Sequence, residues 1–321
     1  MDRTLKLLND SEAAALFGRH DEHLKLVEKE LGLKIVARGE DLTLSGSKEA
    51  VEQGASLFEQ LLVLIRRGAP LHRSEVSYAV RAMRQGHPVQ LHDIYLDKIE
   101  VSSRRGFVIP KTRTQKEYVD AIRKFDIVFG IGPAGTGKSY LAVAMAVHAL
   151  RNQEVSRIIL TRPAVEAGES LGYLPGTMLE KIAPYLRPLY DALYDMMEPE
   201  RVERYMATGI IEVAPLAYMR GRTLNDAYII LDEAQNTTPE QMKMFLTRLG
   251  FDSKTVITGD LTQSDLPNGK PAGLLQVSDL LKGIERIQFV YFTGEDVVRH
   301  PLVMAILEAY DRWQKEKPVL P

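Results

Sequence analysis

Cysteine is absent from the 321 residues of the chain. This absence excludes disulfide bonds, thiolate nucleophiles and zinc sites with thiolate ligands, and it is compatible with a reducing compartment. The sequence also lacks an apolar run of the roughly 20 residues that a membrane-spanning helix needs. Because its first ten residues carry charges where a secretory signal needs an apolar core, we expect a cytoplasmic protein with no membrane contact.

Neither sign of charge is in clear excess, since 41 Lys and Arg stand against 43 Asp and Glu. Binding to nucleic acid would therefore need a local basic surface. The length and an ordinary apolar fraction favour a globular chain with one large and one small domain. Turn signals and changes of pattern predict a small domain at residues 1–68, a connector at 69–108 and a large domain at 109–321.

The most informative stretch is an apolar run followed by glycines, Asp126-Ile-Val-Phe-Gly-Ile-Gly-Pro-Ala-Gly-Thr-Gly-Lys-Ser139. It matches the spacing Gly-x4-Gly-Lys-Ser/Thr between a predicted strand and a predicted helix, the context in which backbone N–H groups cradle phosphates. Lys138 is placed to reach the β/γ oxygens of a nucleotide, and the Ser139 hydroxyl to hold Mg²⁺. The candidate phosphate-binding residues are Gly132, Pro133, Ala134, Gly135, Thr136, Gly137, Lys138 and Ser139.

A second apolar strand, predicted within residues 226–231, ends in two carboxylates. Asp232 can hold Mg²⁺ directly or through water, and Glu233 can orient or deprotonate the attacking water. A strand that ends in a polar turn is common by itself. The phosphate loop upstream makes the catalytic interpretation the stronger one.

Five more side chains are candidates on weaker signals. Gln115 begins a helix before the phosphate loop, and its amide matches the edge of an adenine. Gln263 follows another strand and could sense the γ-phosphate, while Arg299 could act as an arginine finger within its own subunit or a neighbour's. Arg220 and Arg222 flank a glycine and suit phosphate contact. For Gln115 and the three arginines, an ordinary surface role is the alternative.

Further short apolar runs predict buried parallel strands at residues 157–161, 210–214, 254–258 and 287–292. The helical pattern at 178–197 contains Pro184 and Pro188, so we expect it to break into two helices. The fold class is therefore α/β, a mostly parallel sheet with helices on both faces, together with a small α+β domain.

Residues 14–67 read as helix, strand, strand, helix and resemble a KH module, whose Gly-x-x-Gly loop clamps a nucleic-acid backbone. Here the loop is Gly18-Arg-His-Asp21, with an acid in place of the second glycine. A carboxylate there would repel phosphate. Residual RNA binding and a structural or partner-docking role are both open.

The larger part of the sequence, from about residue 105 to 315, resembles the PhoH family. The motifs that carry the resemblance are Ile109-Pro-Lys-Thr with Gln115 and Tyr118, Gly132 to Ser139, Thr161-Arg-Pro-Ala-Val-Glu-Ala-Gly-Glu169, Arg220-Gly-Arg222-Thr, Asp232-Glu-Ala-Gln-Asn236, Gly259-Asp-Leu-Thr-Gln263 and Arg299-His-Pro301. The resemblance implies one RecA-like P-loop ATPase core that uses ATP and Mg²⁺, with links to RNA metabolism. It also suggests self-assembly into a ring and association with an endoribonuclease of ribosomal RNA maturation.

Three functions fit these expectations. The first is a Mg-dependent ATPase that couples hydrolysis to remodelling of RNA or of an RNA–protein complex. The second is an ATP-gated scaffold for a ribonuclease partner with little turnover. The third is a small-molecule kinase, which would need an acceptor pocket in place of Glu233 and the Gln263 sensor.

Overall fold

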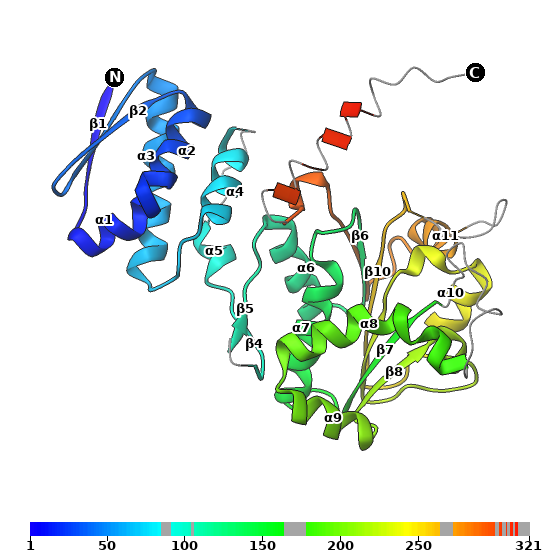
Figure 1. Cartoon of the computed structure of the whole chain (residues 1–321). Helices are drawn as coiled ribbons and strands as arrows, with labels where there is room; N and C mark the ends of the chain where they lie inside the picture. Colours follow the sequence, from blue (N-terminus) through cyan, green and yellow to red (C-terminus); the bar gives the residue numbers. More distant parts are fainter. Residues whose placement is uncertain are drawn as a thin grey trace, which may run out of the picture. The chain divides into compact units, whose positions relative to one another are not determined.

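The computed structural model divides the chain into two compact units, one formed by Met1–Glu100 with Phe107–Lys116 and one by Val101–Gly106 with Glu117–Pro321. Figure 1 shows the elements of both. The structure describes residues 1–84, 91–103, 106–163, 178–263, 272–298, 302, 303, 306, 309, 310, 312 and 313, with the backbone alone for 178–183.

The first unit contains an antiparallel sheet in the order β1-β3-β2 and the helices that pack on it. Its elements in chain order are β1 (Asp2–Lys6), α1 (Asp10–Phe17), η1 (Arg19–Asp21), α2 (Glu22–Leu31), β2 (Lys34–Arg38), β3 (Asp41–Ser45) and α3 (Lys48–Arg66). Leu42 and Leu44 alternate with polar residues along β3 and are fully buried. Ser47 caps α3 by accepting a hydrogen bond from the Ala50 N–H at 3.2 Å. The unit is α+β, as expected for a KH-like module.

Two further helices belong to the core of this unit. They are α4 (Arg73–Arg84) and α5 (Leu91–Tyr95), followed by the short hairpin of β4 (Ile99–Glu100) and β5 (Phe107–Val108). Val76, Val80 and Ile94 are buried in the same apolar cluster as the residues of α3. Burial of these side chains explains the helical pattern in the segment that the sequence analysis treats as a connector.

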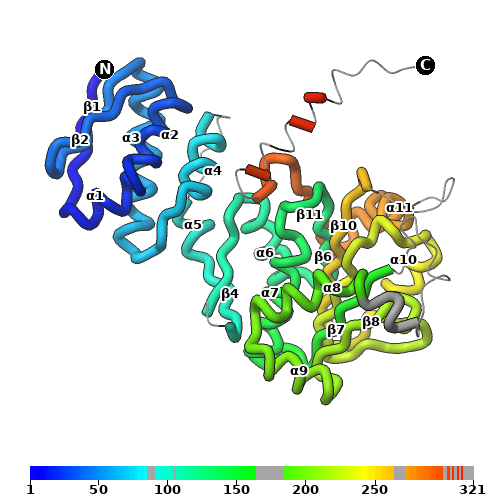
Figure 2. Tube along the Cα trace, viewed as in Figure 1, coloured from blue at the N-terminus to red at the C-terminus, as the bar shows by residue number. Residues whose placement is uncertain are grey.

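The second unit is built on a six-stranded sheet in the order β11-β6-β10-β9-β7-β8. All neighbouring strands in it run parallel. The strands are β6 (Ile127–Ile131), β7 (Arg157–Arg162), β8 (Ile211–Pro215), β9 (Ala227–Leu231), β10 (Lys254–Gly259) and β11 (Ile287–Tyr291). Strands distant in sequence are neighbours, and Figure 2 shows β11 beside β6. One strand, β10, separates the phosphate-loop strand β6 from β9, the strand that precedes the two carboxylates.

Helices cover both faces of this sheet (Figure 1). They are α6 (Arg113–Lys124), α7 (Lys138–Arg151), α8 (Met178–Met196), α9 (Pro199–Ala207), α10 (Pro239–Leu246) and α11 (Gly273–Leu280). Figure 1 shows α6, α7 and α8 on one side and α10 and α11 on the other. The apolar cluster under α10 and α11 contains Ile229, Leu231 and Ile257, alternate residues of two strands.

Strand register brings several chain segments to one edge of the sheet. Ile131 pairs with Gly259, Leu231 with Ile257 and Thr161 with Leu231. Because these residues lie at or near the carboxyl ends of parallel strands, the segments that follow them meet at that edge. Ligands of open parallel sheets bind at such an edge.

The expected break within residues 178–197 is wrong, because α8 continues through Pro184 and Pro188. Both prolines lie four residues apart on the exposed side of the helix. The carbonyl groups that they leave without an N–H donor therefore lie toward water. The opposite side packs Leu186, Leu189 and Leu193 into the core, which holds the helix together.

Among the helices that the structure describes, none has the length and the hydrophobicity needed to cross a bilayer.

Candidate active site

The phosphate loop connects the buried strand β6 to α7. Gly132, Gly135 and Gly137 have φ values of 149°, 83° and 81°, a region that strongly favours glycine. A Cβ on Gly132 would lie 2.4 Å from the carbonyl oxygen of Phe292, so only glycine fits there. Gly137 is the N-cap residue of α7, and the loop therefore ends at the positive end of a 14-residue helix. The expected strand, loop and helix are all present.

Lys138 is folded back over this loop. Its Nζ donates hydrogen bonds to the carbonyl oxygens of Gly132 at 2.6 Å and Pro133 at 2.7 Å, and to Thr136 Oγ1 at 3.2 Å. Burial lowers the pKa of Lys138, and the nearby carboxylates, that of Asp260 first, oppose this effect. The ammonium group therefore lies against loop carbonyls that a bound phosphate could replace as its partners.

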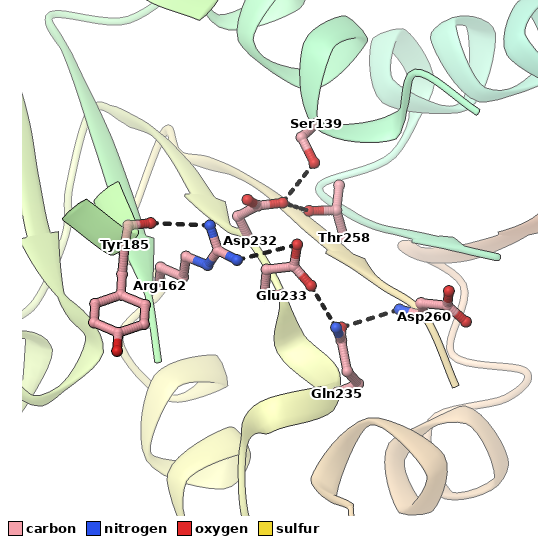
Figure 3. A network of polar contacts seen from close by, with 8 residues as sticks. All are labelled: Ser139, Arg162, Tyr185, Asp232, Glu233, Gln235, Thr258 and Asp260. Atoms are coloured by element: carbon pink, nitrogen blue, oxygen red, sulfur yellow. Dashed lines mark hydrogen bonds and ion pairs between the residues drawn. The ribbon is translucent and has the colours of Figure 1, made fainter. Parts of the chain in front are cut away.

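Asp232 follows β9 and is buried, with 4% of its surface exposed. Its Oδ1 accepts hydrogen bonds from Ser139 Oγ at 2.5 Å and Thr258 Oγ1 at 2.6 Å, which join the phosphate loop, β9 and β10 (Figure 3). Within the part of the chain that the structure describes, no lysine, arginine or histidine forms an ion pair with Asp232. A buried carboxylate beside a hydroxyl and a phosphate loop, with no ion pair of its own, fits the oxygen ligands of Mg²⁺.

Glu233 has the left-handed φ of 54° and holds its carboxylate between two side chains. Arg162 Nη2 lies 3.2 Å from Glu233 Oε1, and Gln235 Nε2 donates to Glu233 Oε2. Gln235 Oε1 in turn accepts from the backbone N–H of Asp260 at 3.0 Å. Figure 3 shows this chain of contacts across the ends of β7, β9 and β10.

Asp260 follows β10 and is also buried. Its Oδ1 accepts from the Thr262 N–H at 2.9 Å and from the Thr262 hydroxyl at 2.7 Å. Its Oδ2 is buried without a hydrogen-bond partner in the structure. An orphaned carboxylate oxygen at this edge is suited to a ligand that brings a cation or a hydrogen-bond donor.

A cavity of about 280 Å³ lies where these groups meet. It is lined by Ala134, Gly135, Gly137, Lys138, Ser139, Tyr140, Asp232, Glu233, Gly259, Asp260 and Gln263. The structure thus gathers five of the side chains singled out in the sequence, those of Lys138, Ser139, Asp232, Glu233 and Gln263. Together they present an ammonium group, a hydroxyl, two carboxylates and an amide to one space, the groups needed to bind and hydrolyse a nucleoside triphosphate.

The remaining side-chain candidates are Gln115, Arg220, Arg222 and Arg299. Gln115 belongs to the first unit, where its Oε1 accepts from the Lys111 N–H at 2.6 Å, so its role as a base reader stays a prediction. Arg222 forms a two-pronged ion pair with Glu212, at 2.6 and 2.7 Å, which engages its guanidinium within the protein. Arg220 is exposed. Arg299 lies outside the described residues.

Three residues of the site were missed in the sequence analysis as partners of the carboxylates: Arg162, Gln235 and Thr258. Each lies at the end of a buried strand or within a few residues of it. That position is the one signal that could have identified them.

Comparison with known proteins gives the family. Residues 107–311 match the family model PhoH, described as PhoH-like protein. The PhoH-like protein of Bacillus subtilis (strain 168) is 55% identical over 307 residues, which cover 96% of each chain. The PhoH-like protein of Synechocystis sp. is 47% identical over 99% of this chain and 97% of its own, and Protein PhoH of Escherichia coli (strain K12) is 39% identical over 77% and 69%.

Among solved structures, the UvsW helicase from Bacteriophage T4 matches with a TM-score of 0.36 and 13% identity, over 61% of this chain and 64% of that one. The family match covers most of the second unit, including the phosphate loop and both carboxylates. From the motifs, the topology and these relatives together, we conclude that the chain belongs to the PhoH family.

Proposed function

We propose that this protein is a Mg²⁺-dependent ATPase that couples hydrolysis to remodelling of RNA or of an RNA–protein complex. The observation that carries this proposal is the convergence of Lys138, Ser139, Asp232 and Glu233 on one cavity beside a glycine-rich loop and a helix N-terminus. Each of these groups has a defined task in phosphoryl transfer to water.

In this proposal the backbone N–H groups of residues 132–139 and the Lys138 ammonium bind the phosphates of ATP. Ser139 and Asp232 would hold Mg²⁺, which neutralises charge on the phosphates when bound. Glu233 orients the attacking water and accepts its proton. Gln263, which lines the same cavity, reports the γ-phosphate to the segment after β10.

Less direct roles come from the family resemblance. Gln115 would read the adenine, and Arg299 would stabilise the departing phosphate within one subunit or across a ring of subunits. RNA, an endoribonuclease of ribosomal RNA maturation and further copies of this chain are the partners that we propose, and the cytoplasm is the location. The KH-like unit would contact RNA or dock the partner.

The scaffold alternative has one observation in its favour. Lys138 binds carbonyls of its own loop and both oxygens of Glu233 are engaged, an arrangement suited to slow turnover. A small-molecule kinase is less favoured because Glu233 and Gln263 line the cavity where an acceptor would bind.

Phosphate release from ATP, measured over a panel of RNAs and without RNA, separates these functions. The ATPase proposal predicts Mg²⁺-dependent release that at least one RNA stimulates. Tight ATP binding without release under every condition would favour the scaffold. Transfer of phosphate only to an added metabolite would favour the kinase.

A further inference from the structure

Arg162 joins three parts of the second unit through one guanidinium. It is the last residue of β7, and its side chain is 20% exposed. Its Nη1 donates to the carbonyl oxygen of Tyr185 in α8 at 2.9 Å, and its Nη2 lies 3.2 Å from Glu233 Oε1 (Figure 3). The planar guanidinium is thus held through two of its nitrogens, by the backbone carbonyl of Tyr185 and by the carboxylate of Glu233.

The second oxygen of Glu233 is also engaged. Gln235 Nε2 donates to it, and Gln235 is itself fixed because its Oε1 accepts from the Asp260 N–H at 3.0 Å. Gln235 has 3% of its surface exposed, whereas the Glu233 side chain is 36% exposed, so the carboxylate can be reached by water while its partner is held in the protein. A carboxylate has roughly four acceptor positions, and these two contacts fill one position on each oxygen and fix the orientation of the group, so it can accept a proton from water only where its remaining positions point.

We propose that Arg162 is a positioning residue that restrains Glu233 in this engaged state, and that a phosphate oxygen which competes for the guanidinium releases it. The inference rests on the proposed ATPase function. Guanidinium groups form charge-assisted hydrogen bonds with both carboxylates and phosphates, so a phosphate can replace Glu233 as the partner of Arg162. The phosphate can come from the bound nucleotide or from an RNA backbone, and the two sources have different kinetic signatures.

The size of the effect follows from the contact. Ion pairs with this degree of exposure contribute up to about 1 kcal/mol, which corresponds to about a fivefold change in rate or affinity. Removing the guanidinium should therefore raise kcat without RNA, or lower ATP affinity, by up to about that factor, depending on which phosphate competes. A group that acted directly on the transition state would lower kcat when removed.

Three variants test the proposal in the full-length protein: Arg162→Ala, Arg162→Lys and the matched control Arg286→Ala. Arg286 also pairs with a carboxylate of the second unit, that of Asp126 at 2.6 Å, but it precedes β11 and lies at the opposite edge of the sheet. ATP affinity and steady-state phosphate release would be measured for each, with and without RNA. Arg162→Lys keeps the positive charge, so its ATP affinity and its rate of phosphate release should lie between those of wild type and Arg162→Ala. If Arg162→Ala strongly lowers the melting temperature, Arg162→Lys is the variant that tests the proposal.

If RNA supplies the competing phosphate, Arg162→Ala raises kcat without RNA about fivefold and reduces the stimulation by RNA. If the nucleotide supplies it, Glu233 is already released in the ATP complex of wild type, so the variant leaves kcat unchanged and lowers ATP affinity by up to about fivefold, because the contact of Arg162 with the phosphate is lost. Arg286→Ala should change neither quantity. Combining Arg162→Ala with Glu233→Gln should give the activity of Glu233→Gln alone, because Arg162 acts through Glu233.

The inference is overturned if Arg162→Ala changes neither kcat nor ATP affinity, or if it lowers kcat. If wild type hydrolyses ATP and Glu233→Gln hydrolyses it more slowly, such a result contradicts this inference but leaves the proposed function in place. If wild type neither binds nor hydrolyses ATP, the proposed function itself fails.

Discussion

Two buried carboxylates, one in each unit, have very different partners. Glu12 of the first unit is 5% exposed and Asp232 of the second is 4% exposed. Glu12 accepts hydrogen bonds from the Leu8 N–H at 2.6 Å and from Arg66 Nε at 2.6 Å. Asp232 accepts from two hydroxyls, and no basic residue in the described part of the chain forms an ion pair with it.

A buried negative charge is costly unless it is paired and hydrogen-bonded. Glu12 has a cationic partner within the chain, so its role is complete in the folded protein. Asp232 lacks such a pair and lies beside a phosphate loop, so its site is suited to a cation that arrives with a ligand. The comparison separates a carboxylate that stabilises a fold from one that we assign to function.

The largest expected effect is that of Asp232→Ala. We expect ATP turnover to fall by at least about 10³-fold, because loss of a metal ligand removes several kcal/mol of transition-state stabilisation. Phosphate release during a Mg²⁺ titration measures it. Glu12→Gln serves as the control and should keep wild-type turnover. Turnover of the Asp232 variant within tenfold of wild type would contradict the assignment.

The next prediction concerns two lysines, both of which donate hydrogen bonds to backbone carbonyls. Lys138 binds carbonyls of the phosphate loop, whereas Lys254 binds those of Ile122 and, at 2.7 Å, Phe125 at the end of α6. Lys138→Ala should weaken ATP binding by about 10- to 100-fold, since a charge-assisted phosphate contact is lost. Lys254→Ala should lower stability and leave ATP affinity nearly unchanged. Titration with a fluorescent ATP analogue checks both, and equal affinities for the two variants would refute the distinction.

The same contrast shows what could be predicted from sequence. The phosphate loop and Asp232 were predictable because residue spacing within a short segment, together with the apolar runs before them, indicates their chemistry. Arg162, Gln235 and Thr258 were not, because their proximity arises from the register of parallel strands. The strands predicted at residues 157–161 and 254–258 are confirmed, and their signal was the short apolar run in each segment.

Two other differences have local causes. Strand β1 was missed because only Leu5 is buried in it, which leaves no clear alternation. The continuity of α8 through two prolines depends on tertiary packing of its apolar side, which outweighs the local cost of proline.

A smaller effect concerns the stability of the first unit. Glu12→Gln should lower the free energy of unfolding by about 1–3 kcal/mol, because the charge-assisted bonds to Arg66 and Leu8 become neutral ones. Urea unfolding measures the change. The control Glu59→Gln removes an exposed partner of Arg3 and should cost less than about 1 kcal/mol. Equal losses for the two variants would show that burial of Glu12 contributes nothing.

The pH dependence of stability should follow from the same carboxylate. The hydrogen bond from Arg66 is the main cause that holds the pKa of Glu12 below its ordinary value of 4.5. Its contribution to stability is therefore present above pH 4.5 and is lost as the pH falls through the lower folded-state value. Urea unfolding between pH 6 and pH 3 should show a shallower decline for Glu12→Gln than for wild type. Parallel curves would contradict the coupling.

The smallest expected effect concerns the Gly18–Asp21 loop. Asp21 has φ of 59°, which glycine adopts easily, so Asp21→Gly restores the Gly-x-x-Gly pattern without strain. Loss of the negative charge should raise RNA affinity a few-fold at low salt, and Asp21→Asn should give part of this gain. Fluorescence anisotropy with a labelled RNA at fixed salt tests it. An unchanged affinity in both variants would favour a docking role for this unit.

The central claim is that Glu233 activates water beside a bound nucleotide, and Glu233→Gln tests it most directly. The variant should bind ATP with an affinity within about threefold of wild type, while phosphate release falls by about 10²- to 10⁴-fold, the usual contribution of a general base. Retained binding with lost turnover is the result that we predict. Hydrolysis at the wild-type rate would contradict the account.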